Sequence, residues 1–180
     1  MAVDNDVTAD RVLDLIPQQR PFRFIDTILS MDDEKIRAAY RFRADESFYR
    51  GHFPGNPVTP GAILIEAMAQ TGVVAMGIYL LLKQGMPVSA LREMTTLFAF
   101  ADEIEFAGIV LPGETVILHG EKIYLRKGNL KTRCRVTREN GEFVCGGVLT
   151  GTGVKNRGKK TDTGAINGYR SNKWIKTGLS

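Results

Sequence analysis

The sequence predicts a single α+β domain in which an antiparallel sheet of about six strands wraps around one long helix. Residues 62–82 contain Glu66 as their only charged side chain, and a helix that is apolar on all sides is typical of a buried core. On both sides of this run, segments alternate between apolar and polar residues with the period of a strand.

Before the long helix, the chain predicts one short helix and two strands. Residues 10–15 suit a helix with Thr8 or Asp10 as its N-cap. Residues 22–30 are apolar and β-branched enough for a first strand, and residues 36–43 alternate as a half-buried second strand. The predicted inward face of the second strand carries Ile36, Ala38, Tyr40 and Phe42.

After the helix we expect four strands, at residues 91–105, 116–125, 130–137 and 142–150. The last two are joined by Asn140-Gly141, a two-residue hairpin signal. In that register, opposed residues have numbers that sum to 281, so Cys134 and Cys145 are diagonal neighbours on one face. We interpret them as small buried thiols and not as a metal site.

The long apolar run also has about the length of a membrane span. However, Glu66 and Gln70 lie inside it, and a carboxylate within a membrane is energetically expensive. The flanking strands also need an apolar partner to cover them. We therefore expect a buried core helix and no membrane span.

Residues 51–70 combine chemistry-bearing side chains with rigid backbone. His52, one of two histidines, lies in a loop rich in Gly and Pro, and Glu66 follows 14 residues later on the helix. Pro60 is suited to the first turn of that helix. Unpaired N–H groups at a helix start favour a developing negative charge. A base, an acid and an oxyanion donor therefore converge near one helix end. The stretch reads Gly51-His52-Phe53-Pro54-Gly55-Asn56-Pro57-Val58-Thr59-Pro60-Gly61-Ala62-Ile63-Leu64-Ile65-Glu66-Ala67-Met68-Ala69-Gln70.

This stretch resembles the signature of the β-hydroxyacyl-acyl-carrier-protein dehydratases of type II fatty acid synthesis. Its three parts are the Gly-His-Phe-Pro-Gly loop, the Pro-Val-x-Pro-Gly turn and the Glu-Ala-x-Ala-Gln helix, which occur in this order at matching spacing. The likeness covers roughly residues 12–151, and Glu66 places it with the Glu-type, dehydratase-only branch. The resemblance implies a hotdog fold for a domain at residues 1–151.

For the site, the resemblance implies elimination of water from a (3R)-hydroxyacyl thioester without a cofactor or metal, to give the trans-2-enoyl product. His52 is the expected base for the C2 proton, and Glu66 the expected acid for the 3-hydroxyl. The N–H of Gly61 is the expected donor to the thioester oxygen. We expect Gln70, one turn past Glu66, to hold its carboxyl in place. Expected to line the acyl tunnel are Phe53, Ile63 and Met68.

The resemblance also implies two partners. One is an acyl carrier protein, whose phosphopantetheine arm holds the substrate. The other is a second copy of the chain, because the active sites of the family lie at a subunit interface, with His52 facing the partner subunit's Glu66. Such dimers often assemble into trimers of dimers.

Two departures from the family pattern concern carrier docking. Basic residues usual before the Pro-Gly turn are replaced by Glu103, Glu105 and Ala107, and the usual His-Arg-Tyr is replaced by residues 18–20, Gln-Gln-Arg. Residues 152–180 form a tail with seven basic side chains and one acidic side chain, which we expect to be flexible. We expect this tail, or Arg20, Arg23 and Arg50, to supply the positive charge that carrier docking needs.

Several alternatives stay open. A hotdog thioesterase or a hydratase acting on coenzyme A thioesters is a second possible function, and a non-catalytic acyl-binding subunit is a third.

Nucleic-acid binding is not expected, because residues 1–151 show no basic stripe with interleaved aromatics. The start of the chain is acidic and lacks an apolar run, so we expect a cytoplasmic protein. The second histidine, His119, lies outside any motif and is expected to be structural. The sequence leaves the acyl chain length and the pathway open.

Overall fold

The computed structural model describes residues 7–155 and consists of one long central helix, shorter helices and a six-stranded sheet. All neighbouring strands are antiparallel, and their order is β1-β2-β4-β5-β6-β3. The helical segments are α1 (Ala9–Leu15), the 3-10 helix η1 (Ser47–Arg50), α2 (Gly61–Ala69), the π-helix η2 (Gln70–Ala75), α3 (Met76–Lys83) and α4 (Val88–Arg92). The strands are β1 (Thr27–Met31), β2 (Lys35–Arg41), β3 (Met94–Phe106), β4 (Thr115–Arg126), β5 (Asn129–Arg138) and β6 (Phe143–Lys155).

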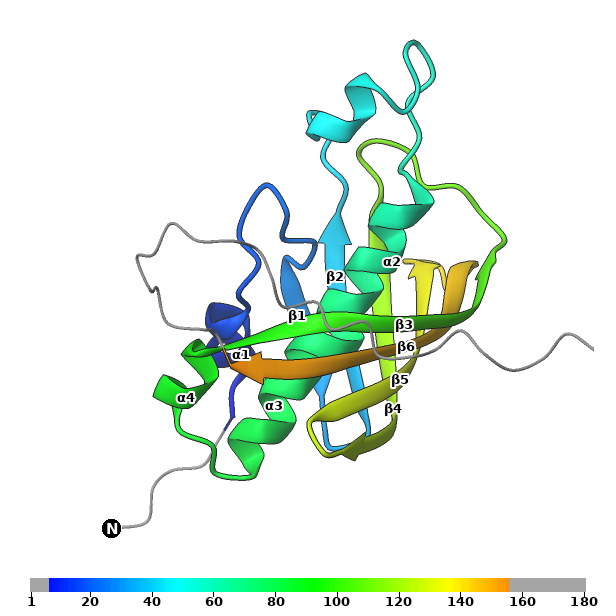
Figure 1. The fold of residues 1–180 in the computed structure, drawn as a ribbon. Coiled ribbons are helices and arrows are strands. Elements are labelled where there is room, and N and C mark those ends of the chain that lie inside the picture. Colours follow the sequence, from blue (N-terminus) through cyan, green and yellow to red (C-terminus); the bar gives the residue numbers. More distant parts are fainter. Residues whose placement is uncertain (1–6, 156–180) are drawn as a thin grey trace, which may run out of the picture.

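Figure 1 shows the sheet curving around the helix formed by α2, η2 and α3. The alternation predicted for the second strand is confirmed, because its four inward residues are buried: Ile36, Ala38, Tyr40 and Phe42. The predicted N-cap of the first helix is also confirmed, since the hydroxyl of Thr8 accepts a hydrogen bond from the N–H of Arg11.

The central helix runs without interruption from Gly61 to Lys83 and is long and apolar enough, by those criteria alone, to cross a membrane. However, 78% of its most apolar window is buried inside the fold. The sheet therefore supplies the apolar partner that the sequence required, and the helix is a core helix.

The middle of this helix approaches the sheet very closely. A Cβ on Gly72 would lie 2.3 Å from Sγ of Cys134, and a Cβ on Gly120 of β4 would lie 2.6 Å from Cα of Gly72. These two glycines let the π-helical turn contact the sheet backbone directly. Turns of π-helix occur mostly as single insertions in α-helices, often at functional sites.

Replacing Gly72 by alanine should lower the free energy of unfolding by about 1–3 kcal/mol, because the added methyl overpacks this contact. Gly77→Ala is a matched control on the same helix, since its Cβ would lie 3.6 Å from Cδ2 of Leu130, an ordinary contact. The control should equal or exceed the wild type in stability, because alanine is the better helix former. Denaturant unfolding measures both, and equal values for the two variants would contradict this packing.

The hairpin register predicted from Asn140-Gly141 is confirmed over most of its length. Val136 pairs with Cys145, and Cys134 pairs with Gly147, so each pair sums to 281. Both cysteines are free and buried. Burial raises the pKa of each thiol to about 12, which keeps both in the unreactive protonated form.

Three boundaries differ from the sequence prediction by more than two residues. The first strand begins at Thr27 and not at residue 22. The backbone groups of Phe22 and Phe24 hydrogen-bond to the side chain of Gln70 and not to a neighbouring strand. Residues 88–92 form α4, a short helix that starts after Pro87 and buries Leu91, before β3 begins. The last strand continues to Lys155, past the boundary expected at residue 151, while residues 156–180 of the basic tail lie outside the described residues.

Strand β3 lies at the edge of the sheet and pairs only with β6 among the described strands. It exposes four large apolar side chains, with relative exposures of 51% for Leu97, 46% for Phe98, 65% for Phe100 and 49% for Phe106. An apolar edge strand of this length offers both unpaired backbone groups and apolar surface to another chain.

Candidate active site

The loop that carries His52 projects beyond the start of α2 (Figure 1). Paired backbone hydrogen bonds hold it closed: Phe53 and Asn56 exchange N–H and C=O groups, and the N–H of Val58 donates to the carbonyl of His52. Gly55 has a φ of +77°, which glycine adopts without strain in such a turn. The loop is therefore a fixed platform for the imidazole.

The hydrogen bonds of the loop also define which nitrogen of His52 carries the proton. Nδ1 lies 3.0 Å from the carbonyl oxygen of Val58. A carbonyl only accepts, so Nδ1 must be the donor, and in the neutral ring Nε2 is left with a free lone pair. The ring stacks on Phe53 at a centroid distance of 4.0 Å, which further fixes its plane. This geometry suits Nε2 to accept a proton.

Glu66 lies half-buried on α2, and its carboxyl is oriented by Gln70 as the sequence suggested. Nε2 of Gln70 donates to Oε1 of Glu66 at 2.8 Å. The orientation of the Gln70 amide is defined because its Oε1 accepts from the N–H of Phe24 and its Nε2 also donates to the carbonyl of Phe22. Gln70 is fully buried and all of these bonds are short, so it links the 22–24 segment rigidly to the carboxyl.

Burial raises the pKa of Glu66, and the hydrogen bond from Gln70 opposes this only in part. The carboxyl therefore keeps its proton to a higher pH than an ordinary glutamate. Within residues 7–155 no hydrogen bond or ion pair joins His52 to Glu66 of the same chain.

The start of α2 presents free N–H groups, as expected for Gly61. The carbonyl of Pro60 accepts from Ile63 and Leu64, whereas the N–H of Gly61 donates to no backbone group among the described residues. The ring of Phe106, at the end of β3, covers this position so closely that a Cβ on Gly61 would lie 3.0 Å from it. The sequence did not indicate this contact of Phe106 with the candidate site, because no pattern links it to a glycine 45 positions earlier.

The three residues expected to line an acyl tunnel lie in different environments. Phe53 is 53% exposed beside His52, Ile63 is half-buried against the core, and Met68 is fully buried within it. None of them lines the apolar cavity of about 250 Å³ that lies further along the central helix. Their role as tunnel residues stays a prediction.

The remaining candidate groups lie elsewhere. His119 is on β4, where its Nε2 hydrogen-bonds with the hydroxyl of Thr137 at 3.1 Å. Burial, together with Arg135 and Arg37, lowers its pKa to about 4, so it is neutral at physiological pH. No group of three or more His, Cys, Asp or Glu side chains that could hold a metal ion occurs within residues 7–155.

The family model and the sequence relatives agree on one family. A model of the FabA-like domain matches residues 16–145. A 3-hydroxyacyl-[acyl-carrier-protein] dehydratase FabZ from Caldicellulosiruptor bescii is 37% identical over 78% of this chain and 94% of that protein. A FabZ from Listeria monocytogenes is 32% identical over 75% of this chain and 88% of the relative.

Solved structures confirm the hotdog fold. The dehydratase heterocomplex ApeI:P from Xenorhabdus doucetiae matches with a TM-score of 0.68 at 12% identity, over 83% of this chain and 93% of that chain. A thioesterase from Haemophilus influenzae matches with a TM-score of 0.56 at 15% identity, over 83% and 92% of the two chains. At these identities the matches concern the fold alone.

Proposed function

The chain belongs to the FabA-like domain family, and on that premise we propose that it is a 3-hydroxyacyl-[acyl-carrier-protein] dehydratase. It removes water from a (3R)-hydroxyacyl thioester and forms the trans-2-enoyl thioester, in fatty acid synthesis or related lipid or polyketide synthesis. The observation that carries the proposal is that the chain holds both a fixed imidazole and a half-buried carboxyl of raised pKa, and that it spans nearly the whole length of its FabZ relative.

In the proposed reaction, Nε2 of His52 takes a proton from C2 of the substrate. The protonated carboxyl of Glu66 delivers a proton to the 3-hydroxyl, so the C3–O bond breaks and water leaves. The N–H of Gly61 binds the thioester oxygen as it gains negative charge, a contribution of about 10²–10³ in rate for such a donor. No electrons are transferred, so the reaction needs no redox cofactor.

The proposed assembly is a homodimer that pairs the β3 edges of two chains. The exposed apolar side chains of β3 support this, because they lie on the strand with an unpaired edge. Such a dimer would place Phe106 and Gly61 near the interface, since Phe106 is the last residue of β3 and its ring covers Gly61 at the start of α2. The proposed active site then combines His52 with the partner subunit's Glu66, and the dimers can assemble into hexamers. We place this assembly in the cytoplasm.

Replacing Gln70 by leucine should move the alkaline limb of the pH–rate profile to higher pH. The acid must be protonated, so activity falls as pH rises through the pKa of Glu66, and Gln70 lowers that pKa. Thr71→Val is a matched buried control, because the hydroxyl of Thr71 has no partner among the described residues. If the alkaline limb of Gln70→Leu lay at the same pH as that of the wild type, Glu66 would not be the group whose ionisation causes this limb.

Carrier docking is proposed to use basic groups near the site together with the tail. Arg50 is exposed beside the His52 loop, whereas Arg20 is already ion-paired with Asp26 at 2.8 Å. Truncation after Lys155 leaves β6 whole and should raise KM for carrier-bound substrate, more at low salt than at high salt. KM measured at several salt concentrations checks this, and an unchanged KM would assign docking to other groups.

Incubation with 3-hydroxyacyl chains on an acyl carrier protein, followed by mass spectrometry, tests the proposed function. A dehydratase produces carrier species lighter by one water that absorb as enoyl thioesters. Release of free carrier thiol without an enoyl product would instead identify a thioesterase. Unchanged substrate would point to a non-catalytic acyl-binding subunit, while turnover of coenzyme A thioesters in preference to carrier thioesters would identify the hydratase alternative.

A further inference from the structure

Two strands of the sheet carry exposed arginines that have no counter-charge. They are Arg37 of β2 and Arg133 and Arg135 of β5. None of the three forms a hydrogen bond or an ion pair within residues 7–155. By contrast, Arg138 at the end of β5 is ion-paired with Glu114 at 2.6 Å. The three unpaired guanidinium groups are therefore available to a ligand.

The strand register places Arg37, His119 and Arg135 side by side across the sheet, in what is called here the Arg-His-Arg row. Arg37 lies opposite His119 of β4, and His119 lies opposite Arg135. Directly opposed residues point to the same face of a sheet. Neighbouring strands are about 4.8 Å apart, so the backbones of the two arginines are about 10 Å apart. Beyond Arg135 the row continues through Gly146 to Glu105 of β3, which forms no ion pair within the described chain.

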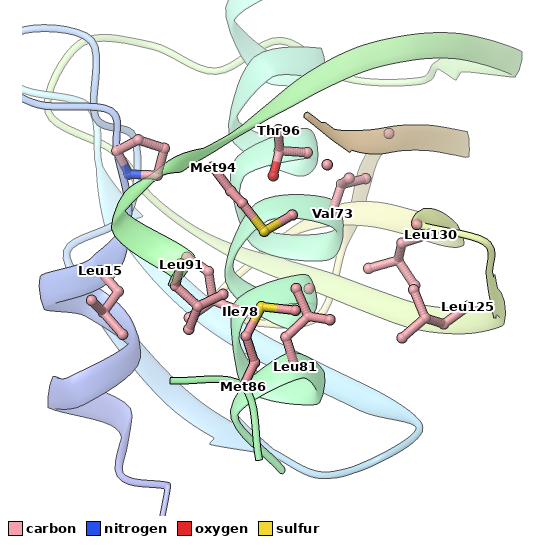
Figure 2. A pocket seen from close by; sticks show the side chains of 15 residues that line it. Leu15, Val73, Ile78, Leu81, Met86, Leu91, Met94, Thr96, Leu125 and Leu130 are labelled. Atoms are coloured by element: carbon pink, nitrogen blue, oxygen red, sulfur yellow. The ribbon is translucent and has the colours of Figure 1, made fainter. Parts of the chain in front are cut away.

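The row lies on the outer face of the sheet, away from the central helix. Cys134 and Val136, which flank Arg135 on β5, are buried. Figure 2 shows Leu130 of the same strand among the side chains that line the apolar cavity beside the central helix. Because side chains alternate along a strand, Arg133 and Arg135 point the other way. Strand β6 separates β5 from the β3 edge, so the proposed dimer leaves the row uncovered.

The surface beside the row is hollowed. A hollow of about 290 Å³ is lined by the three residues of the row and by Arg133. Two carboxylates also line it, and both have other partners. Asp32 accepts the N–H groups of Glu34 and Lys35. Glu121 lies opposite Arg133, but its carboxylate is 3.7 Å from Nζ of Lys35. The hollow therefore keeps an excess of positive charge.

His119 gives the row a third donor. The imidazole is half-buried, and its Nε2 lies 3.1 Å from the hydroxyl oxygen of Thr137, which can donate to it. In that tautomer Nδ1 carries the proton, and it has no partner within residues 7–155. A small oxyanion that enters the hollow reaches this N–H, whereas the surface of an acidic protein contacts only the ends of the arginines. The row therefore fits a small anion better than it fits a protein surface.

We propose that the Arg-His-Arg row binds a phosphate or diphosphate group, carried by a soluble compound or by a lipid headgroup. Guanidinium groups form bidentate, charge-assisted hydrogen bonds with phosphate oxygens. The backbone separation of about 10 Å lets each arginine bind one end of a diphosphate, with the imidazole between them. A bound anion also relieves the repulsion between like charges on the sheet. The inference does not rest on the proposed dehydratase function, because none of these residues belongs to the candidate active site.

Inorganic pyrophosphate, titrated into the full chain by calorimetry, tests the site. Arg37→Gln and Arg135→Gln should each weaken binding about tenfold or more, the usual loss when a charged hydrogen-bonding group is removed. Arg126→Gln is the matched control, because it removes the same charge from β4 seven residues past His119. That separation is about 23 Å along a strand, beyond the screening length of about 8 Å. The control should bind pyrophosphate like the wild type.

The ring of His119 reports where the anion binds. The chain has only two histidines, so NMR at neutral pH can follow both rings. Pyrophosphate should shift the ring signals of His119 and leave those of His52 in place. In Arg135→Gln the same shift should need at least about tenfold more pyrophosphate. Shifts at His52 without shifts at His119 would place the anion at the active-site loop and overturn the proposal.

A second measurement distinguishes the two sources of phosphate. Sedimentation with phosphatidylcholine vesicles, with and without phosphatidic acid, measures lipid binding. Pyrophosphate binding without vesicle binding identifies a soluble ligand, and vesicle binding that needs both phosphatidic acid and Arg37 identifies a headgroup. Both arginine variants should keep wild-type dehydration and thermal stability. Absence of both kinds of binding, or binding that Arg37→Gln and Arg135→Gln retain in full, would overturn the proposal. Weakened carrier binding in these variants without any phosphate binding would also overturn it and assign the row to an acidic protein.

Discussion

Replacing His52 by glutamine should lower kcat for dehydration by about 10²–10⁴-fold, the usual contribution of a positioned general base. Glutamine is polar and of similar length, but its amide has no nitrogen that can accept a proton at neutral pH. What the variant loses is the free Nε2 lone pair. Single-turnover rates with saturating carrier-bound substrate measure this loss without interference from product release.

His119→Gln is the matched control, because the chain has only two histidines and His119 lies on β4, bonded to Thr137. This variant should keep wild-type kcat and KM. Comparable losses in both histidine variants would indicate a general effect on the fold and not a base at His52. Thermal unfolding of each variant separates these outcomes.

Replacing Glu66 by glutamine should lower kcat by about 10²–10⁴-fold, because the isosteric amide cannot deliver a proton to the leaving hydroxyl. The amide oxygen can still accept the hydrogen bond from Gln70, so the segment around Phe22 stays attached. Glu93→Gln, at an exposed position after α4, is the matched control and should be fully active.

The same substitution should increase stability at neutral pH. The folded state raises the pKa of Glu66, mainly through burial. As pH rises above the ordinary carboxyl value of 4.5, the unfolded chain ionises first, and the wild type loses stability until the folded pKa is passed. Glu66→Gln avoids that loss, so the two proteins should be equally stable at acid pH and diverge above it.

Denaturant unfolding at several pH values measures this divergence. A residue that is retained for chemistry can be costly to stability, and a gain in stability together with a loss of activity is the signature of such a residue. If Glu66→Gln were instead less stable at neutral pH, the carboxyl would be a structural group of the core.

Much of the fold follows from local patterns in the sequence. The alternation around Tyr40 predicted the buried face of β2, and Asn140-Gly141 predicted the register that pairs Val136 with Cys145. These two predictions succeed because the strand period and the turn type are determined by a few neighbouring residues. The predicted start of β1 was wrong, because the segment at Phe22 and Phe24 is held by the side chain of Gln70, more than 40 residues later in the chain.

The candidate site also combines features that local sequence patterns predict with contacts that they do not predict. The motif predicts His52, Glu66, Gly61 and Gln70 as site residues, and the observed Gln70–Glu66 contact follows from helical spacing. The contact of Phe106 with Gly61 depends on how β3 crosses the helix, and no local pattern encodes it.

Hybrid dimers test most directly whether two chains share one site. The His52→Gln and Glu66→Gln chains are each expected to be inactive, but a dimer containing one of each would hold one intact imidazole–carboxyl pair across its interface. Random assembly of equal amounts should restore about a quarter of the wild-type dehydration rate, since half of the dimers are mixed and each has one working site. A mixture that forms mixed dimers, as seen by native mass spectrometry, yet stays as inactive as either parent would contradict the shared site.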